Sequence, residues 1–396
     1  MKYEIKIKYN IKMSKVSKDF KSFLCELKQS TIKEEKQGEQ EKYNKNDILQ
    51  PIIKYNNTFV IEYASNMNPN LDYTYLIKLL KQYGLKQSNN PNENHLFGII
   101  SPSFFSTKFY LLNNFQFVRS ISDKFSLYFN LKLLFSNYYN QNYPESFLLT
   151  SEHTFSDLQN KVYISRPISA WSGKDIIIID SEYQLKKAQK LLLESRYASG
   201  ISLTEYVSNL VRFQGRKMHL RVYYCMTLIN NVFNAYLLDA GGIYTAKKVY
   251  KNAEWDNTDI HDTHFGNTGV HLFFPEDLYN NTDPKISKIE WQIIYDNMKK
   301  NIEYVSMIAL ANVYKYTNSK NAWEVFGIDF FIRDDLSTFI IEINSKNVGY
   351  KATEKINKYY FDWINDIVIK PTLFPYIDIE QRPCTTSIIT KTILEY

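Results

Sequence analysis

The order of hydrophobic and polar residues along the chain predicts interleaved strands and helices. Short apolar runs and period-two alternation predict strands over residues 58–63, 96–100, 116–118, 162–166, 176–180, 215–228, 232–239, 324–332 and 338–343. Apolar positions spaced three and four residues apart predict helices over residues 72–83, 124–138, 183–195, 285–315 and 357–369. Gly84 follows the first of these helices, at the position where helices commonly end. This mixture of elements predicts an α/β or α+β fold.

The first 47 residues differ from the rest of the chain. Residues 3–11 alternate isoleucine with lysine and predict a half-exposed strand, and residues 15–29 have helical spacing. Residues 33–47 carry charged, glutamine and asparagine side chains with no apolar period. We therefore expect a strand–helix appendage that a flexible linker joins to the main body.

The composition is that of a folded protein. Of the 396 residues, 44% are hydrophobic and 23% are charged, which excludes a disordered chain. The formal net charge of +6 is too small to indicate a nucleic-acid partner, and we expect none. The three cysteines lie far apart, and the sequence has neither a signal peptide nor an apolar run of about 18 residues. We therefore expect a cytoplasmic protein with no membrane partner.

An apolar hairpin near the C-terminal end carries the strongest candidate for chemistry. If its turn centres between Asp335 and Leu336, Asp329 lies opposite Glu342, and Asn344 shares their face because strand side chains alternate. Two opposed carboxylates among apolar neighbours repel each other, and a divalent cation removes that cost. Two carboxylates and an amide suit Mg²⁺. The alternatives are a lysine or arginine that neutralises one carboxylate, or a different register.

A second group of candidates is basic. On the strand predicted over residues 215–228, the side chains of Lys217, His219 and Arg221 point to one face. Such a face suits phosphates or carboxylates, and arginine adds a planar fork of donors. Taken alone, the pattern is more typical of an ordinary solvated strand face. A magnesium site beside it would favour the phosphate-binding interpretation.

Two further motifs give weaker signals. The loop of residues 166–175 contains Lys174 and could fold over phosphates through its backbone N–H groups, although it lacks the spaced glycines of a P-loop. His261, His264 and His271 could be interpreted as a zinc site. No cysteine lies near these histidines, and the segment has no regular period, so we do not favour zinc.

The order and spacing of these segments resemble the tubulin–tyrosine ligase-like branch of the ATP-grasp ligases over residues 58–376. Phe326-Gly-Ile-Asp-Phe-Phe followed by Ile341-Glu-Ile-Asn is similar to the hairpin of that family. Arg216-Lys-Met-His-Leu-Arg is similar to its basic strand, and Tyr163-Ile-Ser-Arg to the strand that carries an ATP-binding lysine. The resemblance implies an ATP-grasp fold with an N-terminal pre-ATP-grasp α/β domain. The implied division is an appendage and linker (1–47), the pre-ATP-grasp domain (48–120), a central lobe (121–205), a C-terminal lobe with the Mg–ATP site (206–376) and a tail (377–396).

The same resemblance implies a role for individual residues. The residues that would hold Mg²⁺ are Asp329, Glu342 and Asn344. The residues that would contact the ATP phosphates are Arg166, Lys174 and Lys217, with Tyr206 and Val207 beside the adenine. Lys217 and Arg221 would also bind the phosphate of an acyl-phosphate, and His219 would help to deprotonate an incoming amine.

Several positions depart from the family pattern. Arg166 stands where the family has lysine, His219 where it has aspartate, and Tyr244 where it has an acceptor-binding arginine. The resemblance implies an ATP-dependent carboxylate–amine ligase that adds an amino acid to a protein tail, such as the acidic tail of tubulin, through an acyl-phosphate. The alternative is a catalytically inactive ATP-grasp scaffold that serves as a nucleotide-binding or structural protein.

Overall fold

The computed structural model describes most of the chain after residue 55. The described residues are 56–61, 74–90, 93–99, 109–113, 119–122, 125–159, 161–168, 175–229, 232–251, 254–263, 270–273, 275–279, 281–316, 321–344, 354–373 and 391–395. The strand, helix and linker predicted for the first 47 residues, the strand predicted over 116–118, Lys174 and His264 all lie outside this set.

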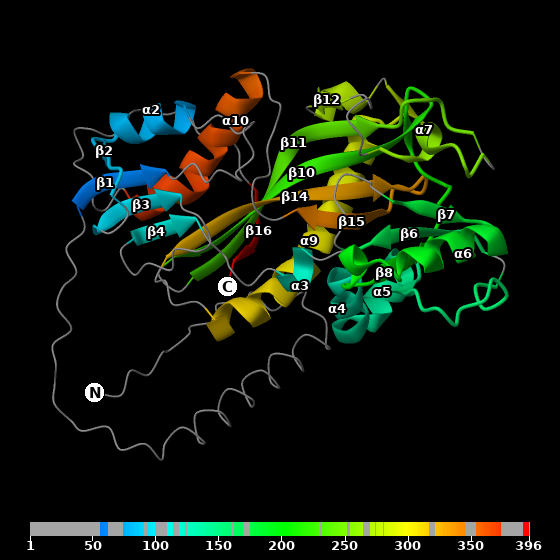
Figure 1. Ribbon diagram of the computed structural model, residues 1–396. Helices are drawn as coiled ribbons and strands as arrows, with labels where there is room; N and C mark the ends of the chain where they lie inside the picture. Colours follow the sequence, from blue (N-terminus) through cyan, green and yellow to red (C-terminus); the bar gives the residue numbers. More distant parts are fainter. Residues whose placement is uncertain are drawn as a thin grey trace, which may run out of the picture.

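Two β-sheets form the framework of the described chain (Figure 1). The main path of the larger, 12-stranded sheet runs β12 (Val270–Phe273), β11 (Val232–Thr245), β10 (Arg216–Ile229), β14 (Ala322–Ile332), β4 (Phe109–Asn113), β3 (His95–Ile99), β1 (Asn56–Ile61) and β2 (Lys86–Gln87). Its other strands are β9 (Arg212–Phe213), β13 (Thr282–Asp283), β15 (Thr338–Asn344) and β16 (Lys391–Glu395). The smaller sheet has the order β5 (Ser146–Leu148), β8 (Ile201–Glu205), β6 (Tyr163–Pro167) and β7 (Ile177–Ile179).

Helices cover both sheets. The N-terminal half of the described chain contributes α2 (Thr74–Gln82), α3 (Arg119–Ser122), α4 (Ser126–Leu134), α5 (Ser136–Asn142), α6 (Glu182–Leu191) and the 3₁₀ turn η2 (Ser195–Tyr197). The C-terminal half contributes α7 (Thr258–His261), α8 (Pro275–Leu278), α9 (Lys288–Tyr316), α10 (Glu354–Ile364), the π-helical turn η3 (Asn365–Ile369) and α11 (Lys370–Leu373). No helix within these described segments combines the length and apolarity needed to cross a bilayer.

The two faces of β10 belong to different cores. Leu220 and Val222 point to the face that packs against the long helix α9, in the larger hydrophobic cluster. Tyr223 and Cys225 point to the opposite face, in the cluster that contains side chains of α2 and α10. Because strand residues alternate, this second face continues towards the start of β10 as residues 221, 219 and 217. The candidate basic residues therefore lie on the same face as a hydrophobic core, nearer the start of the strand than the residues that pack in that core.

Most of the predicted elements are confirmed. The long antiparallel pair β10–β11, the helix α9 and the hairpin β14–β15 lie where the sequence predicts them. The single helix predicted over residues 124–138 is wrong, because Phe135 leaves the helical region (φ −137°, ψ 50°) and separates α4 from α5. The ring of Phe135 packs edge-on against Tyr304 of α9, 4.8 Å between ring centroids. A tertiary contact thus overrides the helical period at this position.

The buried amide of Asn301 joins α9, α5 and β15. Its Nδ2 donates to the backbone oxygen of Thr338 at 3.0 Å, and its Oδ1 accepts from the hydroxyl of Tyr143 at 2.5 Å. We expect Asn301→Ala to lower the free energy of unfolding by about 2–4 kcal/mol, because two buried partners lose their hydrogen bonds. Urea denaturation measures this loss. Asn142→Ala removes a half-buried amide that bonds only within α5, so a comparable loss in that control would contradict the expectation.

Candidate functional site

The β14–β15 hairpin brings the predicted metal ligands together. Asp329 pairs with Glu342, as predicted. The reason differs from the prediction, because the pairs next to the turn centre it on Asp335 rather than between residues 335 and 336. The register then shifts between Asp329 and Phe330, which leaves Ile341 as an extra residue in β15. Such a bulge re-aims side chains beside a site, and here it sets the two carboxylates opposite each other.

Asn344 completes a small group of oxygen-bearing side chains. Its Nδ2 lies 3.2 Å from Oε1 of Glu342 and 3.5 Å from Oδ2 of Asp329. The orientation of an asparagine amide is assigned rather than observed, and the opposite orientation presents Oδ1 to the same point. Two carboxylates and an amide oxygen form a hard donor set that fits Mg²⁺, with water and phosphate oxygens completing the coordination.

Arg221 forms a bidentate ion pair with Asp329. Its Nε and Nη2 each donate to one carboxylate oxygen at 2.6 Å. Burial alone would lower the pKa of Arg221, but the adjacent Asp329 outweighs burial and raises it. The alternative left open from the sequence, an arginine that neutralises one carboxylate, is therefore what the structure contains, and carboxylate repulsion by itself does not indicate a metal. The case for a metal rests instead on the converging oxygen atoms.

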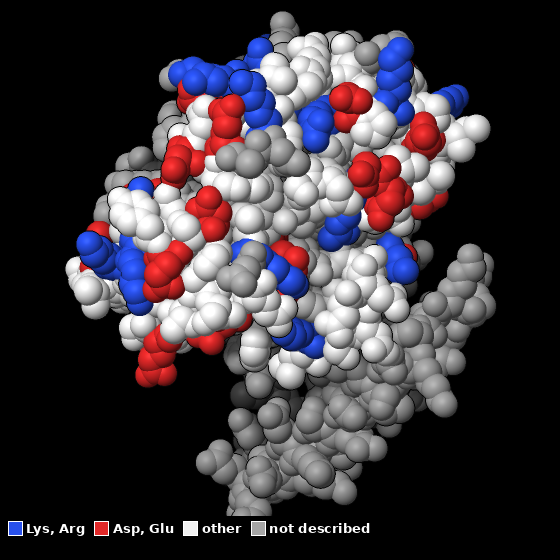
Figure 2. All heavy atoms as spheres, turned by 90° about the vertical axis from the view of Figure 1, so that its right-hand side faces the viewer, with Lys and Arg blue, Asp and Glu red and all other residues white. Residues whose placement is uncertain are grey.

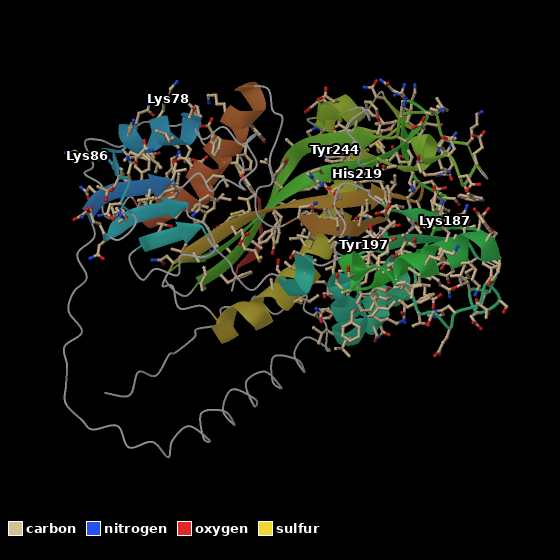
Figure 3. All side chains as sticks on the ribbon, in the orientation of Figure 1. Lys78, Lys86, Lys187, Tyr197, His219 and Tyr244 are labelled. Atoms are coloured by element: carbon tan, nitrogen blue, oxygen red, sulfur yellow. The ribbon has the colours of Figure 1, made fainter. Side chains whose placement is uncertain are left out.

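His219 lies beneath Tyr244, and Figure 3 shows the two side chains next to each other on β10 and β11. Their rings stack with centroids 4.9 Å apart and planes within 5°. The missing side chain of Gly242 makes room for this ring, since a Cβ there would lie 3.0 Å from Tyr244. His219 is only 1% exposed, its Nδ1 lies 2.7 Å from Thr263 Oγ1 and its Nε2 3.7 Å from Asp329 Oδ2. Because so little of the ring is exposed, the role of His219 as a base stays a prediction from the sequence.

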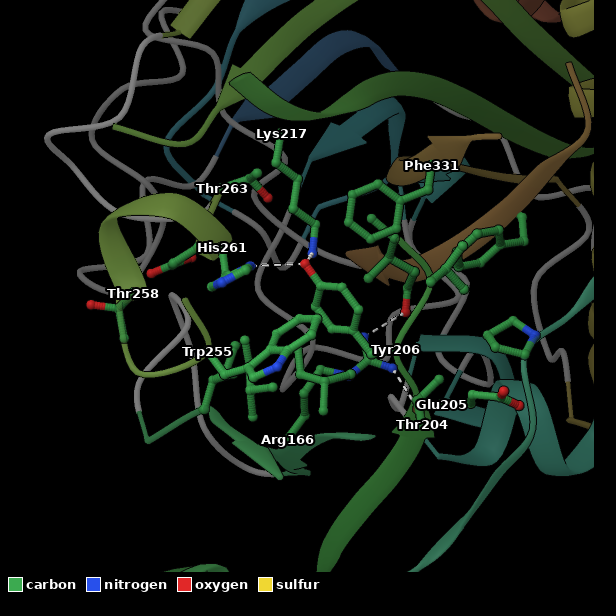
Figure 4. Close-up of a pocket in the computed structure, with 18 of the residues that line it drawn as sticks. Arg166, Thr204, Glu205, Tyr206, Lys217, Trp255, Thr258, His261, Thr263 and Phe331 are labelled. Atoms are coloured by element: carbon green, nitrogen blue, oxygen red, sulfur yellow. Dashed lines mark hydrogen bonds between the residues drawn. The ribbon is translucent and has the colours of Figure 1, made fainter. Parts of the chain in front are cut away.

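A cavity lies between the smaller sheet and the face of the larger sheet that carries Lys217 (Figure 4). Of the residues predicted to bind ATP, Arg166, Tyr206, Val207 and Lys217 line it. The walls that the sequence did not predict come from β6, β7, β8, β15 and the segment of α7, and include Ile164, Ile176, Ile178, Thr204, Glu205, Trp255, Thr258, His261, Asp262, Thr263 and Ile341.

Two buried cations face this cavity. Arg166 is 5% exposed and donates from Nη1 to the backbone oxygen of Ile341 and from Nη2 to Thr204 Oγ1, both at 3.2 Å. Lys217 is 4% exposed, and burial lowers its pKa to about 7. Neither cation forms an ion pair with an acidic side chain in the described part of the chain. Because buried charges are normally paired, this arrangement favours an anionic ligand.

The histidine cluster has a structural explanation. His261 holds Tyr206 OH at 2.8 Å through Nδ1 and the backbone oxygen of Glu254 at 3.0 Å through Nε2. Both ring nitrogens are therefore used within the protein. No group of three or more histidine, cysteine, aspartate and glutamate side chains that could hold a metal occurs among the residues with described positions. The zinc interpretation thus finds no support at His261.

The outer surface near the cavity carries mixed charge. On the face seen in Figure 2, basic and acidic side chains are interspersed. Lys247 and Lys248, close in sequence to Tyr244, pair with Asp259 at 3.8 Å and 3.1 Å. These lysines are already partly neutralised, so they do not form a uniformly basic surface for an acidic chain.

Together these features define a mixed α+β protein with buried cations in a cavity between two sheets and a pair of opposed carboxylates on the β14–β15 hairpin. The chain matches the model of the Tubulin-tyrosine ligase family over residues 107–370, two thirds of its length, and it belongs to that family. It is also similar to a protein of Tetrahymena thermophila named probable alpha-tubulin polyglutamylase Ttll1, with 25% identity over 239 residues. That similarity covers 54% of this chain and 56% of the relative, so the chain spans about half the length of this curated relative. The family resemblance inferred from the sequence is confirmed.

Proposed function

We propose that this protein is an ATP-grasp ligase that activates a carboxylate with ATP and joins an amino acid to it. The observation that carries the proposal is the pair of buried cations, Arg166 and Lys217, that face one cavity and form no ion pair with an acidic side chain among the described residues. A triphosphate supplies the negative charge that these groups lack. The family to which the chain belongs supports ATP as its source.

Each part of the cavity has a place in this scheme. Arg166 and Lys217 bind phosphate oxygens, while Tyr206 and Val207, at the end of β8, pack beside the adenine. The residues that would hold Mg²⁺ are Asp329, Glu342 and Asn344. When bound, the ion neutralises charge on the triphosphate. Arg221 forms an ion pair with Asp329 and so neutralises one of the two carboxylates before the nucleotide binds.

The reaction follows from positioning rather than from covalent chemistry by the protein. A carboxylate oxygen of the acceptor attacks the γ-phosphorus of ATP, and ADP leaves, which gives an acyl-phosphate. The neutral amine of the second substrate then attacks the acyl carbon. Inorganic phosphate leaves as the amide bond forms, and the leaving phosphate takes up the proton that the amine loses. Arg166 and Lys217 stabilise the charge that moves between these oxygens.

The relative's name suggests the substrates to test first. It is a probable alpha-tubulin polyglutamylase, so we propose a tubulin-like acidic protein tail as acceptor and an amino acid such as glutamate as donor of the amine. The mixed surface charge in Figure 2 indicates that recognition of such a tail does not rest on a large basic patch on that face.

Incorporation of a labelled amino acid tests the proposal. We expect the full-length protein with Mg²⁺ and ATP to add glutamate, or another member of an amino-acid panel, to tubulin and to release ADP in equal amount. Glu342→Gln serves as the inactive control. Nucleotide binding without ADP release across the whole panel would favour the inactive scaffold, and an absence of nucleotide binding would overturn both functions.

A further inference from the structure

A chain of three hydrogen-bonded side chains forms one wall of the cavity (Figure 4). Nζ of Lys217 lies 3.2 Å from the hydroxyl of Tyr206. The same hydroxyl lies 2.8 Å from Nδ1 of His261, whose Nε2 lies 3.0 Å from the backbone oxygen of Glu254. The three side chains come from β10, the end of β8 and α7, so this series of hydrogen bonds connects both sheets and the cavity wall.

Each hydrogen bond in this series has one possible donor and one possible acceptor. The backbone oxygen of Glu254 only accepts, so the hydrogen of neutral His261 is on Nε2 and Nδ1 is an acceptor. Burial, with a contribution from the nearby Lys217, lowers the pKa of His261 to about 4, so the ring is neutral at neutral pH. Tyr206 must then donate its one hydrogen to Nδ1. Its oxygen is left with lone pairs that face the ammonium group of Lys217.

Aromatic rings confine the ammonium group as well. Nζ of Lys217 lies 4.3 Å from the ring centre of Tyr206 and 5.1 Å from that of Phe331. Both distances are within the range of cation–π attraction. With one N–H donated to Tyr206, two of its three donors remain for a ligand.

We propose that Tyr206 and His261 are positioning residues that orient the ammonium group of Lys217 towards the phosphates and keep it charged when the nucleotide enters. The inference rests on the proposed function, because it takes ATP as the ligand. It assigns the Tyr206 hydroxyl to lysine orientation, in addition to the contact of its ring with adenine. His261 acts only through Tyr206.

The charged groups around Lys217 give the inference a pH dependence. Burial lowers its pKa to about 7, Asp262 acts to raise it and Arg166 acts to lower it further. The other titratable groups of this hydrogen-bonded set are Tyr206 and His261, and Tyr250 acts on the hydroxyl of Tyr206. Lys217 is charged below this pKa and neutral above it, so nucleotide affinity falls as the pH rises through about 7. Without the Tyr206 hydroxyl, which accepts a hydrogen bond from the ammonium group, the pKa of Lys217 is lower, and nucleotide affinity therefore begins to fall at a lower pH.

Binding of the non-hydrolysable analogue AMP-PNP with Mg²⁺ between about pH 5.5 and about pH 8.5 tests the inference in wild type, Tyr206→Phe and His261→Ala. At neutral pH and above, we expect affinity about tenfold weaker in Tyr206→Phe, with a pH profile displaced to lower pH, and a smaller displacement in His261→Ala. Adenosine, which lacks phosphates, should bind wild type and Tyr206→Phe equally. Tyr163→Phe removes a hydroxyl that bonds Glu145 in the smaller sheet, and should match wild type.

Four results separate the outcomes. A Tyr206→Phe profile parallel to that of wild type, or an equal loss of adenosine binding, would overturn the positioning role and leave the proposed function standing. Wild type that binds AMP-PNP independently of pH would also overturn it. Failure of wild type to bind AMP-PNP at any pH would reject the proposed function, and the positioning role with it.

Discussion

Glu342→Gln will abolish Mg²⁺-dependent nucleotide binding and leave the protein folded. Glutamine keeps the shape of the side chain and its contact with Asn344, but it removes the negative charge that a hard cation requires. We expect nucleotide affinity in the presence of Mg²⁺ to fall at least about 100-fold, equivalent to about 2.7 kcal/mol. The half-buried position of Glu342 predicts a change in unfolding free energy of less than about 1 kcal/mol. Calorimetric titration with Mg²⁺ and with EDTA, together with urea denaturation, measures both quantities.

Asp329→Asn provides the matched comparison. Asp329 is 0% exposed and takes both donors of Arg221, so its neutralisation leaves a largely buried guanidinium without its counter-charge. Breaking such a pair costs about 3–5 kcal/mol. We therefore expect Asp329→Asn to lose both stability and nucleotide binding, whereas Glu342→Gln loses binding alone. Retention of Mg–ATP affinity by Glu342→Gln would remove the metal assignment, and wild-type stability of Asp329→Asn would contradict the structural role of the ion pair.

Lys217→Met will stabilise the ligand-free protein while it removes nucleotide binding. The pKa of Lys217 falls from its ordinary value of 10.5 to about 7 in the folded chain, chiefly through burial. Below about pH 7 the folded protein must keep the buried charge, at a cost of up to about 4 kcal/mol, and methionine removes that cost. Between the two pKa values the unfolded state binds more protons than the folded state, so wild-type stability rises with pH. The advantage of methionine is therefore largest at about pH 6 and fades towards about pH 10.

Urea denaturation at about pH 6 and about pH 9.5 measures this effect. After the lost hydrogen bond to Tyr206 is counted, we expect a net gain of about 2–3 kcal/mol at the lower pH. Lys186→Met is the control, because Lys186 is exposed and pairs with Glu182 on α6. That variant should show no gain that depends on pH. If Lys217→Met is less stable than wild type at the lower pH, the expectation is contradicted. Other groups would then stabilise the buried charge of Lys217.

The parts of the candidate site that could be predicted are those that depend on the alternation of side chains along a single strand. Alternation along one strand places Lys217, His219 and Arg221 on one face. The pairing of Asp329 with Glu342 was predicted from a different turn position, and the bulge at Ile341 that sets it gives no signal in the sequence. The ion pair between Arg221 and Asp329 was not predicted, because it requires β10 to pair with β14. These strands lie about 100 residues apart in sequence, and no periodic signal says which strands become neighbours.

The wall around His261 was missed for a different reason. Residues 254–263 contain only the four-residue helix α7, and so short an element has no measurable period. Strand β8, with Thr204 and Glu205 in the cavity, is also only five residues long. The single useful signal in this segment was His261, and the sequence analysis considered it only as a zinc ligand, which it did not favour. Its neighbours in space, Tyr206 and Lys217, became clear only from the meeting of the two sheets.

Strand β14 also links the site to the N-terminal part of the larger sheet. It pairs with β4 at Trp323 and Asn113, and six residues further along the same strand lies Asp329, about 20 Å away. Both residues belong to one continuous hydrogen-bonded strand, so we expect a ligand that steadies Asp329 to reduce local opening at the opposite end of β14 as well. We therefore anticipate slower amide hydrogen exchange in β4 whenever the cavity is filled. The N-terminal layer thus provides a remote reporter of occupancy, suitable for a fluorescent label placed well away from the chemistry.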